Sequence, residues 1–585
     1  MCCGSRVAQQ LGEASRPTGL GCGGQPEMAS SPAEPTRSDR EETGRIFVQA
    51  FEKENVCAVA LGRMACVNTT WRHEVSVLAN QKRQIALSRA RESLPPGYPS
   101  SLSDLRSAAL GHKKRTKPLL QAEVVALAHL AEADASLRSL ETHAHCADVG
   151  TSALAAATRR GAFELLSLGG VHREGALALG HALSYGPHPL RSLRLDQCFH
   201  MGENGVAAIG RALKDCAFET LSLQQAAVTP EACVGIAEGL HENKYLRTLN
   251  MRHNPLSDNG VLELCKGIGR QASKSRLQSI KLSWAHPLLS QRAALALAKM
   301  AERCSSLEQL ELEHVFDEST GPLAIRRFAL RLPRTSLKTL ELSTNTIDGD
   351  AAFALGYGIA LLPSIRNLHI DSCSFGNNEA DLLAEGCWRA SCVSLGLHSL
   401  SIKAGRRHNM LTDGSSVRSL GSVLSGIRSL DLSGNRIGSE GAQVLSEVLH
   451  SHPIDRLNLS SCSIGDKGAR ALRSMQIKEL KLAENLIREQ GGKELGYRLP
   501  QEALDLSGNA VRNEGAAAIA EGLRHGKCTH IVLDLNSISS DGIESVVRAL
   551  RVRWNAHVDM SGNETDSKLK KRLNISESLL KRIRL

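Results

Sequence analysis

Residues 143–146, with the sequence HAHC, place imidazole and thiol groups close together in the chain. Both groups bind zinc, but a structural zinc site needs a second pair of ligands at a similar spacing. No second pair follows, so we expect packed or solvated side chains there. The sequence accordingly predicts neither a metal centre nor any other cofactor.

Residues 267–275, GIGRQASKS, are the nearest approach to a phosphate-binding loop. That loop needs a glycine directly before the lysine so that backbone amides can close around phosphate, and Ser273 stands before Lys274. We interpret the stretch as a helix end and a loop. The chain also contains neither the G-x-S-x-G turn of serine hydrolases nor the H-E-x-x-H motif of zinc peptidases. These patterns predict a protein that is not an enzyme.

The elements that must position any functional side chain are repeats of about 28 residues. The stretch from Ile427 reads IRSLDLSGNRI, and the stretch from Ile454 reads IDRLNLSSCSI. Both follow the unit L-x-x-L-x-L-x-x-N-x-I. Sixteen such units can be placed, with first positions at 137, 163, 190, 218, 246, 277, 307, 337, 365, 397, 427, 454, 477, 501, 528 and 555. The unit at 528 leaves two strand registers open, one built on Ile531 and Leu533 and the other on Leu533 and Leu535.

Each unit predicts one strand followed by one helix. The L-x-L core alternates with a period of two, which indicates a strand with one buried face. The second half, such as EGAQVLSEVL after Ser439, spaces apolar residues three and four apart, as helices do. Strand, helix and strand in succession imply a parallel sheet with every helix on the same side of it. Packed helices need about 8 to 10 Å between their axes, whereas paired strands lie about 4.8 Å apart, so we expect the repeats to curve into an open horseshoe.

The N position follows each strand, where the backbone bends and its amide and carbonyl groups lose their ladder partners. Asparagine can donate and accept hydrogen bonds there, and a small cysteine can be buried while offering a weak S–H donor. The predicted structural Asn/Cys ladder comprises Cys198, Asn254, Asn345, Cys373, Asn435, Cys462, Asn485, Asn509, Asn536 and Asn563.

The period, the L-x-x-L-x-L-x-x-[N/C]-x-I consensus and the G-A-x-x-L-A-x-x-L helix resemble the ribonuclease-inhibitor-like class of leucine-rich repeat proteins. This class also includes the Ran GTPase-activating protein and the repeat regions of NOD-like receptors. The resemblance covers residues 137–565. It implies an α/β leucine-rich repeat solenoid, a horseshoe with a parallel inner sheet and outer helices, and it implies that a protein partner binds on the concave sheet.

Side chains in the outward positions of the strands are where such a partner would make contact. The predicted partner-binding residues are Trp284, Glu308, Glu311, Glu313, Glu341, His369, Asp371, Asp431, Asn458, Lys481 and Asp505. The middle of this set is acidic, whereas a nucleic-acid groove would need Lys and Arg, so we expect a protein-binding scaffold and no nucleic acid. Trp284 has two interpretations, a binding hot spot or a side chain packed beneath an irregular loop.

Two other functions stay open. A regulator of a small GTPase could donate a loop arginine to the charge that develops during hydrolysis, and the loops contain Arg252, Arg436, Arg488 and Arg512. No local motif distinguishes one of them, so no catalytic residue is assigned, and the acidic tail of animal Ran activators is replaced by a basic end. The other alternative is a cytosolic NOD-like-receptor-type regulator without an ATPase domain.

Three further regions flank the repeats. Residues 1–45 are rich in Gly, Ser and Pro and predict a disordered arm, and residues 46–136 predict a helical N-terminal region. Residues 566–585 hold seven Lys or Arg against two acidic residues, about half of the net charge of +10. Their stripe of Leu569, Leu573, Leu580 and Ile583 predicts a basic C-terminal cap helix.

The cysteines and the hydropathy pattern indicate a compartment. The 16 cysteines lack paired spacing, and no apolar run approaches 18 residues. We therefore expect reduced thiols, a cytoplasmic or nuclear location and no transmembrane span.

Overall fold

The computed structural model describes residues 72–94, 121–133 and most of 137–585. The gaps in the last range are 186–187, 271, 391–396, 398, 405–408, 413, 425, 451, 565–572 and 574–575. The predicted arm over residues 1–45 lies outside the described residues, as does much of the region 46–136. The chain divides into two compact units, Met1–Leu256 with Lys266–Leu277, and Ser257–Cys265 with Gln278–Leu585.

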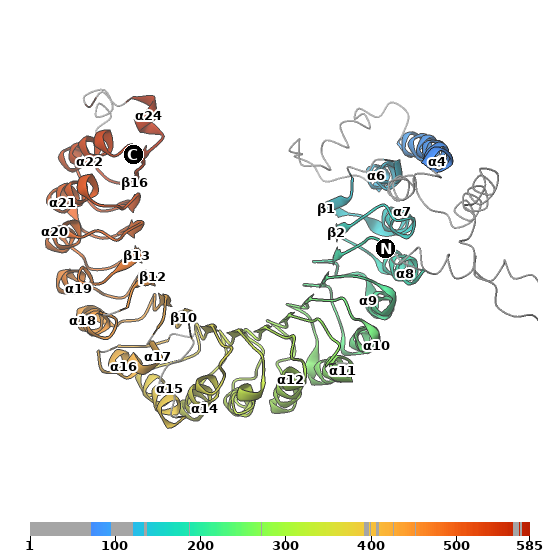
Figure 1. Ribbon diagram of the computed structural model, residues 1–585, viewed down its shortest axis with the longest axis horizontal. Coiled ribbons are helices and arrows are strands. Elements are labelled where there is room, and N and C mark those ends of the chain that lie inside the picture. The colour runs from blue at the N-terminus through green and yellow to red at the C-terminus, as the bar shows by residue number, and fades with distance from the viewer. Residues whose placement is uncertain are drawn as a thin grey trace, which may run out of the picture. The chain divides into compact units, whose positions relative to one another are not determined.

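The described residues of the first unit comprise two helices followed by alternating strands and helices (Figure 1). Its elements are α4 (Arg72–Glu92), α6 (Gln121–Ala133), β1 (Ser139–His145), α7 (Ala147–Arg159), β2 (Leu165–Gly169), α8 (Arg173–Ser184), β3 (Ser192–Arg194), α9 (Gly202–Ala212), η1 (Leu213–Asp215), β4 (Thr220–Ser222), α10 (Pro230–Glu242) and β5 (Thr248–Asn250). Helix α11 (Ser257–Arg270) contributes residues to both units.

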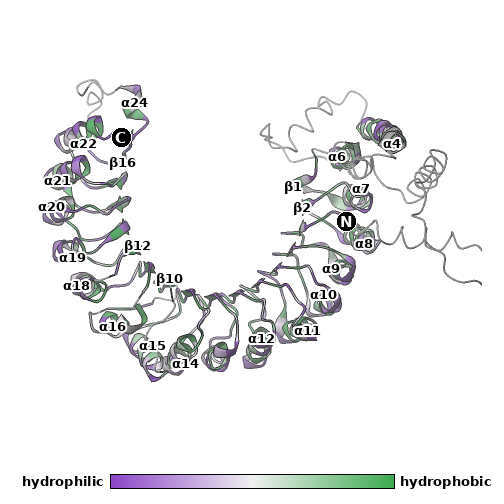
Figure 2. Cartoon of the chain, in the orientation of Figure 1, coloured by the Kyte–Doolittle hydropathy of each residue, from purple (hydrophilic) through white to green (hydrophobic). Residues whose placement is uncertain are grey.

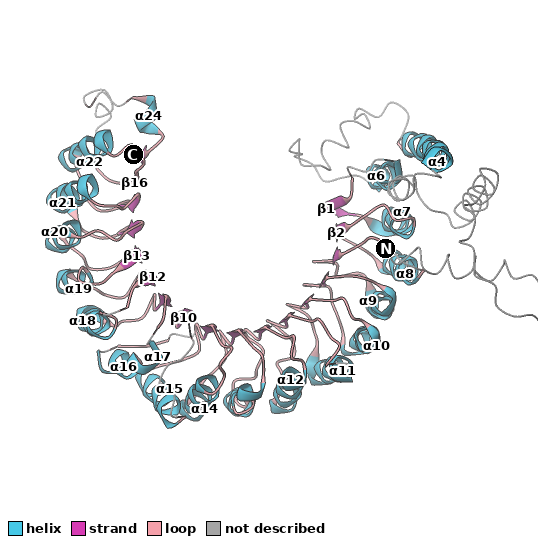
Figure 3. Cartoon of the chain, viewed as in Figure 1, coloured by secondary structure: helices cyan, strands magenta, loops and turns pink. Residues whose placement is uncertain are grey.

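The second unit repeats the same alternation (Figure 3). Its strands are β6 (Ser279–Lys281), β7 (Gln309–Glu311), β8 (Thr339–Glu341), β9 (Asn367–His369), β10 (Ser399–Ser401), β11 (Ser429–Asp431), β12 (Ile454–Asn458), β13 (Ile477–Lys481), β14 (Ala503–Asp505), β15 (His530–Val532), β16 (His557–Asp559) and β17 (Ile583–Arg584). Its helices are α12 (Gln291–Arg303), α13 (Gly321–Ala329), η2 (Leu332–Arg334), α14 (Gly349–Ala360), α15 (Asn377–Arg389), α16 (Gly414–Ser419), α17 (Gly421–Leu424), α18 (Gly438–Val448), α19 (Asp466–Leu472), α20 (Glu489–Tyr497), α21 (Arg512–His525), α22 (Ser540–Val552) and α24 (Glu577–Leu580).

Every strand pairs in parallel with the next one along the chain within its unit, and the paired leucines stand in register. Leu310, Leu340 and Leu368 are aligned in β7, β8 and β9, and the same column continues into β10 and β11. In most three-residue strands the central residue is buried and its two neighbours face outward. Hydrophobic and hydrophilic residues are accordingly interspersed within each repeat (Figure 2). The predicted α/β repeat solenoid is confirmed, and all sixteen predicted units contain a strand.

The two registers left open for the unit at 528 are distinguished by burial. Ile531 and Leu533 are buried, whereas Leu535 is 61% exposed and has a φ of 54°. The first register is therefore the correct one, because Leu535 lies in the turn after β15. Within the described residues, no helix has the length and apolar character to cross a membrane.

Neighbouring helices approach until their backbones are in contact, because small residues face each other at the crossing. A Cβ atom added to Gly239 of α10 would lie 1.9 Å from the carbonyl oxygen of Gly210 in α9. No Cβ contact is that short, so only glycine fits at this crossing. The close approach of the helices brings successive repeats into continuous contact, which stabilises a solenoid that has no single core.

Part of the predicted cap helix over residues 566–585 lies outside the described residues, and its described end differs from a continuous helix. There, Glu577–Leu580 form a helical turn, and Ile583–Arg584 form β17, which pairs in parallel with β16. The amide groups of Val558 and Met560 in and after β16 donate to the carbonyl oxygens of Arg582 and Arg584 at 2.8 and 2.7 Å. A helix could not satisfy these edge amides, which is the physical reason for a strand there.

Candidate functional site on the strand face

Buried amide side chains fix the turn after each strand and thereby the outward side chains. The Asn345 side chain, which is fully buried, donates from Nδ2 to the carbonyls of Leu312 and Leu342, both at 2.7 Å. Its Oδ1 atom accepts from the backbone amides of Val315 and Phe316, both at 3.0 Å. Nδ2 also donates to the carbonyl of Ser343 at 3.3 Å, so one asparagine joins two successive repeats through five hydrogen bonds.

Cysteines occupy the same position in other repeats. The thiol of Cys373 donates to the carbonyl of Leu342 at 3.3 Å, and that of Cys462 donates to the carbonyl of Leu432 at 3.2 Å. Burial raises the pKa of Cys462 to about 12 and raises that of Cys373 further. Such thiols stay protonated at neutral pH, so they serve as donors and not as nucleophiles.

Sequence reasoning missed one member of this ladder. The Asn409 side chain accepts from the amides of Cys373 and Phe375 at 2.7 and 2.9 Å and donates to the carbonyl of Ile370 at 2.8 Å. The repeat that starts at 397 would place its ladder residue at Gly405, four positions earlier. The extra residues hid Asn409 from a pattern of fixed spacing, although it is the next asparagine in the chain.

The outward residues of β6–β11, with the second residue after each strand, form what we call the central strand face. This face carries five carboxylates, Glu311, Glu313, Glu341, Asp371 and Asp431, and two lysines, Lys281 and Lys403. The remaining members are Ser279, Ser283, Gln309, Thr339, Ser343, Asn367, His369, Ser399, Ser401, Ser429 and Ser433. The face is therefore polar with an excess of negative charge, and all of it lies in the second unit.

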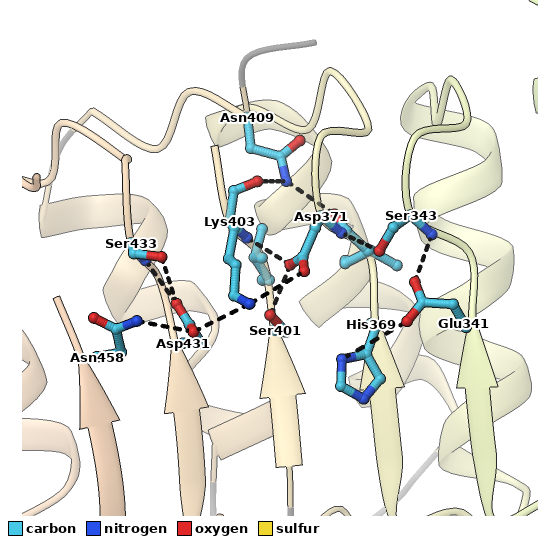
Figure 4. Close-up of polar contacts among 12 residues, drawn as sticks. Glu341, Ser343, His369, Asp371, Ser401, Lys403, Asn409, Asp431, Ser433 and Asn458 are labelled. Atoms are coloured by element: carbon cyan, nitrogen blue, oxygen red, sulfur yellow. Dashed lines mark hydrogen bonds and ion pairs between the residues drawn. The ribbon is translucent and has the colours of Figure 1, made fainter. Parts of the chain in front are cut away.

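Asp371 and Asp431 are held by hydrogen bonds that cross the strands (Figure 4). Asp371 accepts from the hydroxyl of Ser401 and the amide of Lys403, both at 2.7 Å. The Lys403 ammonium lies 3.8 Å from Asp371 and 3.4 Å from Asp431, between the two carboxylates. These contacts preorganise the carboxylates before any partner arrives.

Glu341 has the most perturbed carboxyl group of this face. Burial raises its pKa to about 7, and the nearby Asp371 and Glu313 charges act in the same direction. The Ser343 amide, which donates to Glu341 at 3.0 Å, opposes the rise, and His369 lies 3.9 Å away. Glu341 is therefore partly protonated at neutral pH and is sensitive to any cation placed beside it.

Other predicted residues lie at the border of this face or beyond it. Glu308 precedes β7 and pairs with Lys338 at 2.6 Å, whereas Glu311, within the face, pairs with Lys281 at 2.9 Å. Asn458 extends the network, because its Nδ2 donates to Asp431 at 3.0 Å. Lys481 and Asp505, on β13 and β14, belong to later repeats than the central strand face.

Trp284 lies in the turn after β6, with its φ at 62°. Its indole is half-buried and contacts the His314 ring at 4.5 Å between centroids. The Trp284 amide donates to the carbonyl of Glu313 at 2.8 Å, so the turn of β6 is tied to that of β7. Trp284 thus borders the acidic side chains and keeps part of its surface open.

Within the described residues, no cluster of three or more metal-binding side chains occurs. The loop arginines Arg252, Arg436, Arg488 and Arg512 come from separate repeats. The described part of the chain therefore offers a polar surface, the central strand face, with many charged and hydrogen-bonding groups. Such a surface suits the binding of a partner with complementary charges and hydrogen-bonding groups.

The chain is similar to several known repeat proteins. The family described as Leucine Rich repeat matches residues 242–265, 427–446, 450–472 and 502–520. Ribonuclease inhibitor from Mus musculus is 27% identical over 384 residues, which cover 62% of this chain and 76% of the inhibitor. NACHT, LRR and PYD domains-containing protein 12 from Mus musculus is 26% identical over 337 residues, which cover 57% of this chain and only 29% of that protein.

A solved structure of an internalin from Listeria monocytogenes aligns with a TM-score of 0.36 and 14% identity, over 64% of this chain and 92% of that chain. The repeat consensus, the parallel sheet and the sequence relatives agree. The chain is a leucine-rich repeat protein related to ribonuclease inhibitor and to the repeat regions of the NACHT, LRR and PYD domains-containing proteins.

Proposed function

We propose that this chain is a non-enzymatic recognition module that binds a protein partner on the central strand face. The observation that carries the proposal is the set of carboxylates fixed across neighbouring strands by Ser401, Lys403 and Asn458. Preorganised side chains lose little conformational entropy on binding, and an excess of negative charge favours a partner segment rich in Lys and Arg. Relatives named ribonuclease inhibitor act on another protein, which supports the same mode here.

The partner should be identified by affinity capture from lysate, and its affinity should then be measured by calorimetry. We expect the double variant Glu313→Lys/Glu341→Gln to weaken binding at least tenfold, because the complex would lose two carboxylate charges and gain a positive one. A matched control, Asp350→Lys/Glu447→Gln, makes the same charge change on helices α14 and α18. Equal weakening by both variants would mean that overall charge, and not the strand face, determines the affinity.

We also expect the affinity to rise between pH 6 and pH 8. Because the pKa of Glu341 is raised to about 7, its carboxyl group is mostly protonated in the free protein below that pH. A cationic partner group stabilises the carboxylate and so releases that proton on binding. Deprotonation therefore favours the complex. The Glu341→Gln variant should flatten this pH dependence, and calorimetry in buffers of different ionisation enthalpy would count the released protons. An unchanged slope in the variant would assign the effect to another group.

GTP hydrolysis separates this proposal from a GTPase-activating function. The purified chain should be added in catalytic amount to a panel of small GTPases. We expect no acceleration of hydrolysis, because no motif in the described loops distinguishes an arginine or glutamine that would stabilise the transition state or orient the attacking water. Stimulated hydrolysis would contradict the recognition-module proposal directly.

A further inference from the structure

The helix ends of the last repeats carry a second surface, which the strand-face proposal does not use. We define the helix-end edge as residues 470–474, 497–499, 524–527 and 551–555, which follow or end helices α19, α20, α21 and α22. These segments hold seven Lys or Arg residues and no Asp or Glu. The helices of successive repeats run in the same direction, so their ends lie on one side of the second unit (Figure 1).

Two aromatic side chains stand out on this edge. Tyr497 is 80% exposed and Trp554 is 81% exposed, in a chain with only 3% aromatic residues. The guanidinium of Arg473 lies 5.7 Å from the centroid of the Tyr497 ring. Exposed aromatic rings among arginines are the composition of binding hot spots, and they gain free energy when a partner covers them.

Structural roles account for only part of the positive charge. Cations at the C-terminal ends of helices interact favourably with the helix dipole. Arg524 pairs with Glu521 at 3.1 Å, and the guanidinium of Arg553 donates to the backbone carbonyls of Gly526 and Cys528. Within the described part of the chain, Arg498 and Lys527 have no ion-pair partner. Neither helix dipoles nor ion pairs explain the exposure of the two rings.

The edge is continuous between the two rings. Arg553 joins the loop after α22 to the loop after α21. Leu499, in the loop after α20, packs toward Gly522 of α21, since a Cβ added there would lie 3.2 Å from the leucine Cγ. Tyr497 ends α20, and Trp554 lies two residues after the end of α22. These two helices are two repeats apart, or roughly 20 Å at the usual spacing of packed helices. An extended peptide covers that length with about six residues.

We propose that the helix-end edge binds an acidic polypeptide segment with two apolar side chains about six residues apart. The apolar side chains cover Tyr497 and Trp554, and the carboxylates meet Arg498 and Lys527 between them. A single-stranded nucleic acid fits less well, because stacked bases follow one another at a few ångströms and need successive rings. This site is separate from the central strand face.

The test uses a fluorescein-labelled peptide of 14 Asp and Glu residues in which two positions six apart are leucine, as a designed probe for anisotropy. We expect the full chain to bind it at least tenfold more tightly than three control probes: the same peptide with serine for leucine, its lysine analogue, and an oligothymidylate of 15 nucleotides. The double variant Tyr497→Ser/Trp554→Ser should lose at least tenfold in affinity. Charge reversal by Arg498→Glu/Lys527→Glu should do the same and reduce the salt dependence.

The matched control is Trp388→Ser, which removes a tryptophan that is 70% exposed at the end of α15, away from this edge. It should bind the probe as the wild type does. The side chains substituted on the edge and at Trp388 are exposed, so the melting temperatures of these variants should agree and folding should not confound the comparison. Equal binding of the lysine analogue or the oligothymidylate, or no loss in the Tyr497/Trp554 variant, would overturn the proposal. The Glu313→Lys/Glu341→Gln variant should bind the probe as the wild type does. The proposals for the strand face and for the helix-end edge can therefore be confirmed or refuted independently.

Discussion

Replacing Asn345 by alanine should lower the free energy of unfolding by about 4 kcal/mol. The side chain makes five hydrogen bonds to backbone groups of two repeats and is fully buried. Alanine would leave the amides of Val315 and Phe316 and the carbonyls of Leu312 and Leu342 without these partners. Each buried group left unpaired costs roughly 1–3 kcal/mol, and partial relaxation reduces the sum. Urea unfolding followed by circular dichroism would measure the loss.

Asn367→Ala is the matched control for this substitution. Asn367 lies outward on β9, half-buried, and its Nδ2 donates to the hydroxyl of Thr339 at 2.9 Å. Water can replace this partner, so we expect a loss below about 1 kcal/mol. Asn345→Cys should fall between the two, because a thiol can donate to Leu312 but cannot accept from both amides. Similar losses at positions 345 and 367 would show that the buried ladder does not determine stability.

Replacing Gly239 by alanine should destabilise the first unit by roughly 3 kcal/mol, because the new methyl group would overlap the carbonyl of Gly210. The neighbouring atom belongs to the backbone of α9, so relief requires the two helices to move apart. That movement weakens the contacts on both sides of the crossing. Differential scanning calorimetry and hydrogen exchange of α9 and α10 would report it.

Gly269→Ala provides the control for this prediction. Gly269 is also helical, near the end of α11, but a Cβ added there meets nothing within 4 Å. Alanine should therefore stabilise the helix by about 0.5–1 kcal/mol through its higher helix propensity. Opposite signs for the two substitutions would establish close helix packing as the cause. Two changes of the same sign would contradict it.

Much of the fold could be predicted from the sequence, because each repeat carries its own pattern of strand and helix residues. With sixteen copies, the regular repeats reveal the pattern even where single repeats depart from it. Leu310, Leu340 and Leu368 fall in one column whether they are aligned by sequence or by strand register. The predictions differed from the structure where the spacing changes or the repeat ends. Asn409 lies four positions beyond the consensus, and Ile583 joins the sheet because β16 offers unpaired amides. The placement of these two residues depends on contacts with a neighbouring repeat and not on a local sequence pattern alone.

The candidate site was less predictable than the fold. Outward positions follow from the period of two, so Glu341 and Asp371 could be named as surface residues. Lys403 and Ser401 were not named, although they hold Asp371, because their role depends on contacts between repeats about 30 residues apart. Likewise, the raised pKa of Glu341 follows from its burial among neighbouring strands. The helix-end edge combines side chains of four repeats, which sequence periodicity does not single out.

Site-specific photo-crosslinking tests most directly whether a partner occupies the strand face. A benzophenone amino acid should replace Asn367 on β9 in one variant and Asp350 on α14 in another. The purified partner, identified by capture, is then irradiated with each variant in turn. We predict a covalent product from the position-367 variant and none from the position-350 variant. Crosslinking through position 350 with none through position 367 would contradict binding on the strand face.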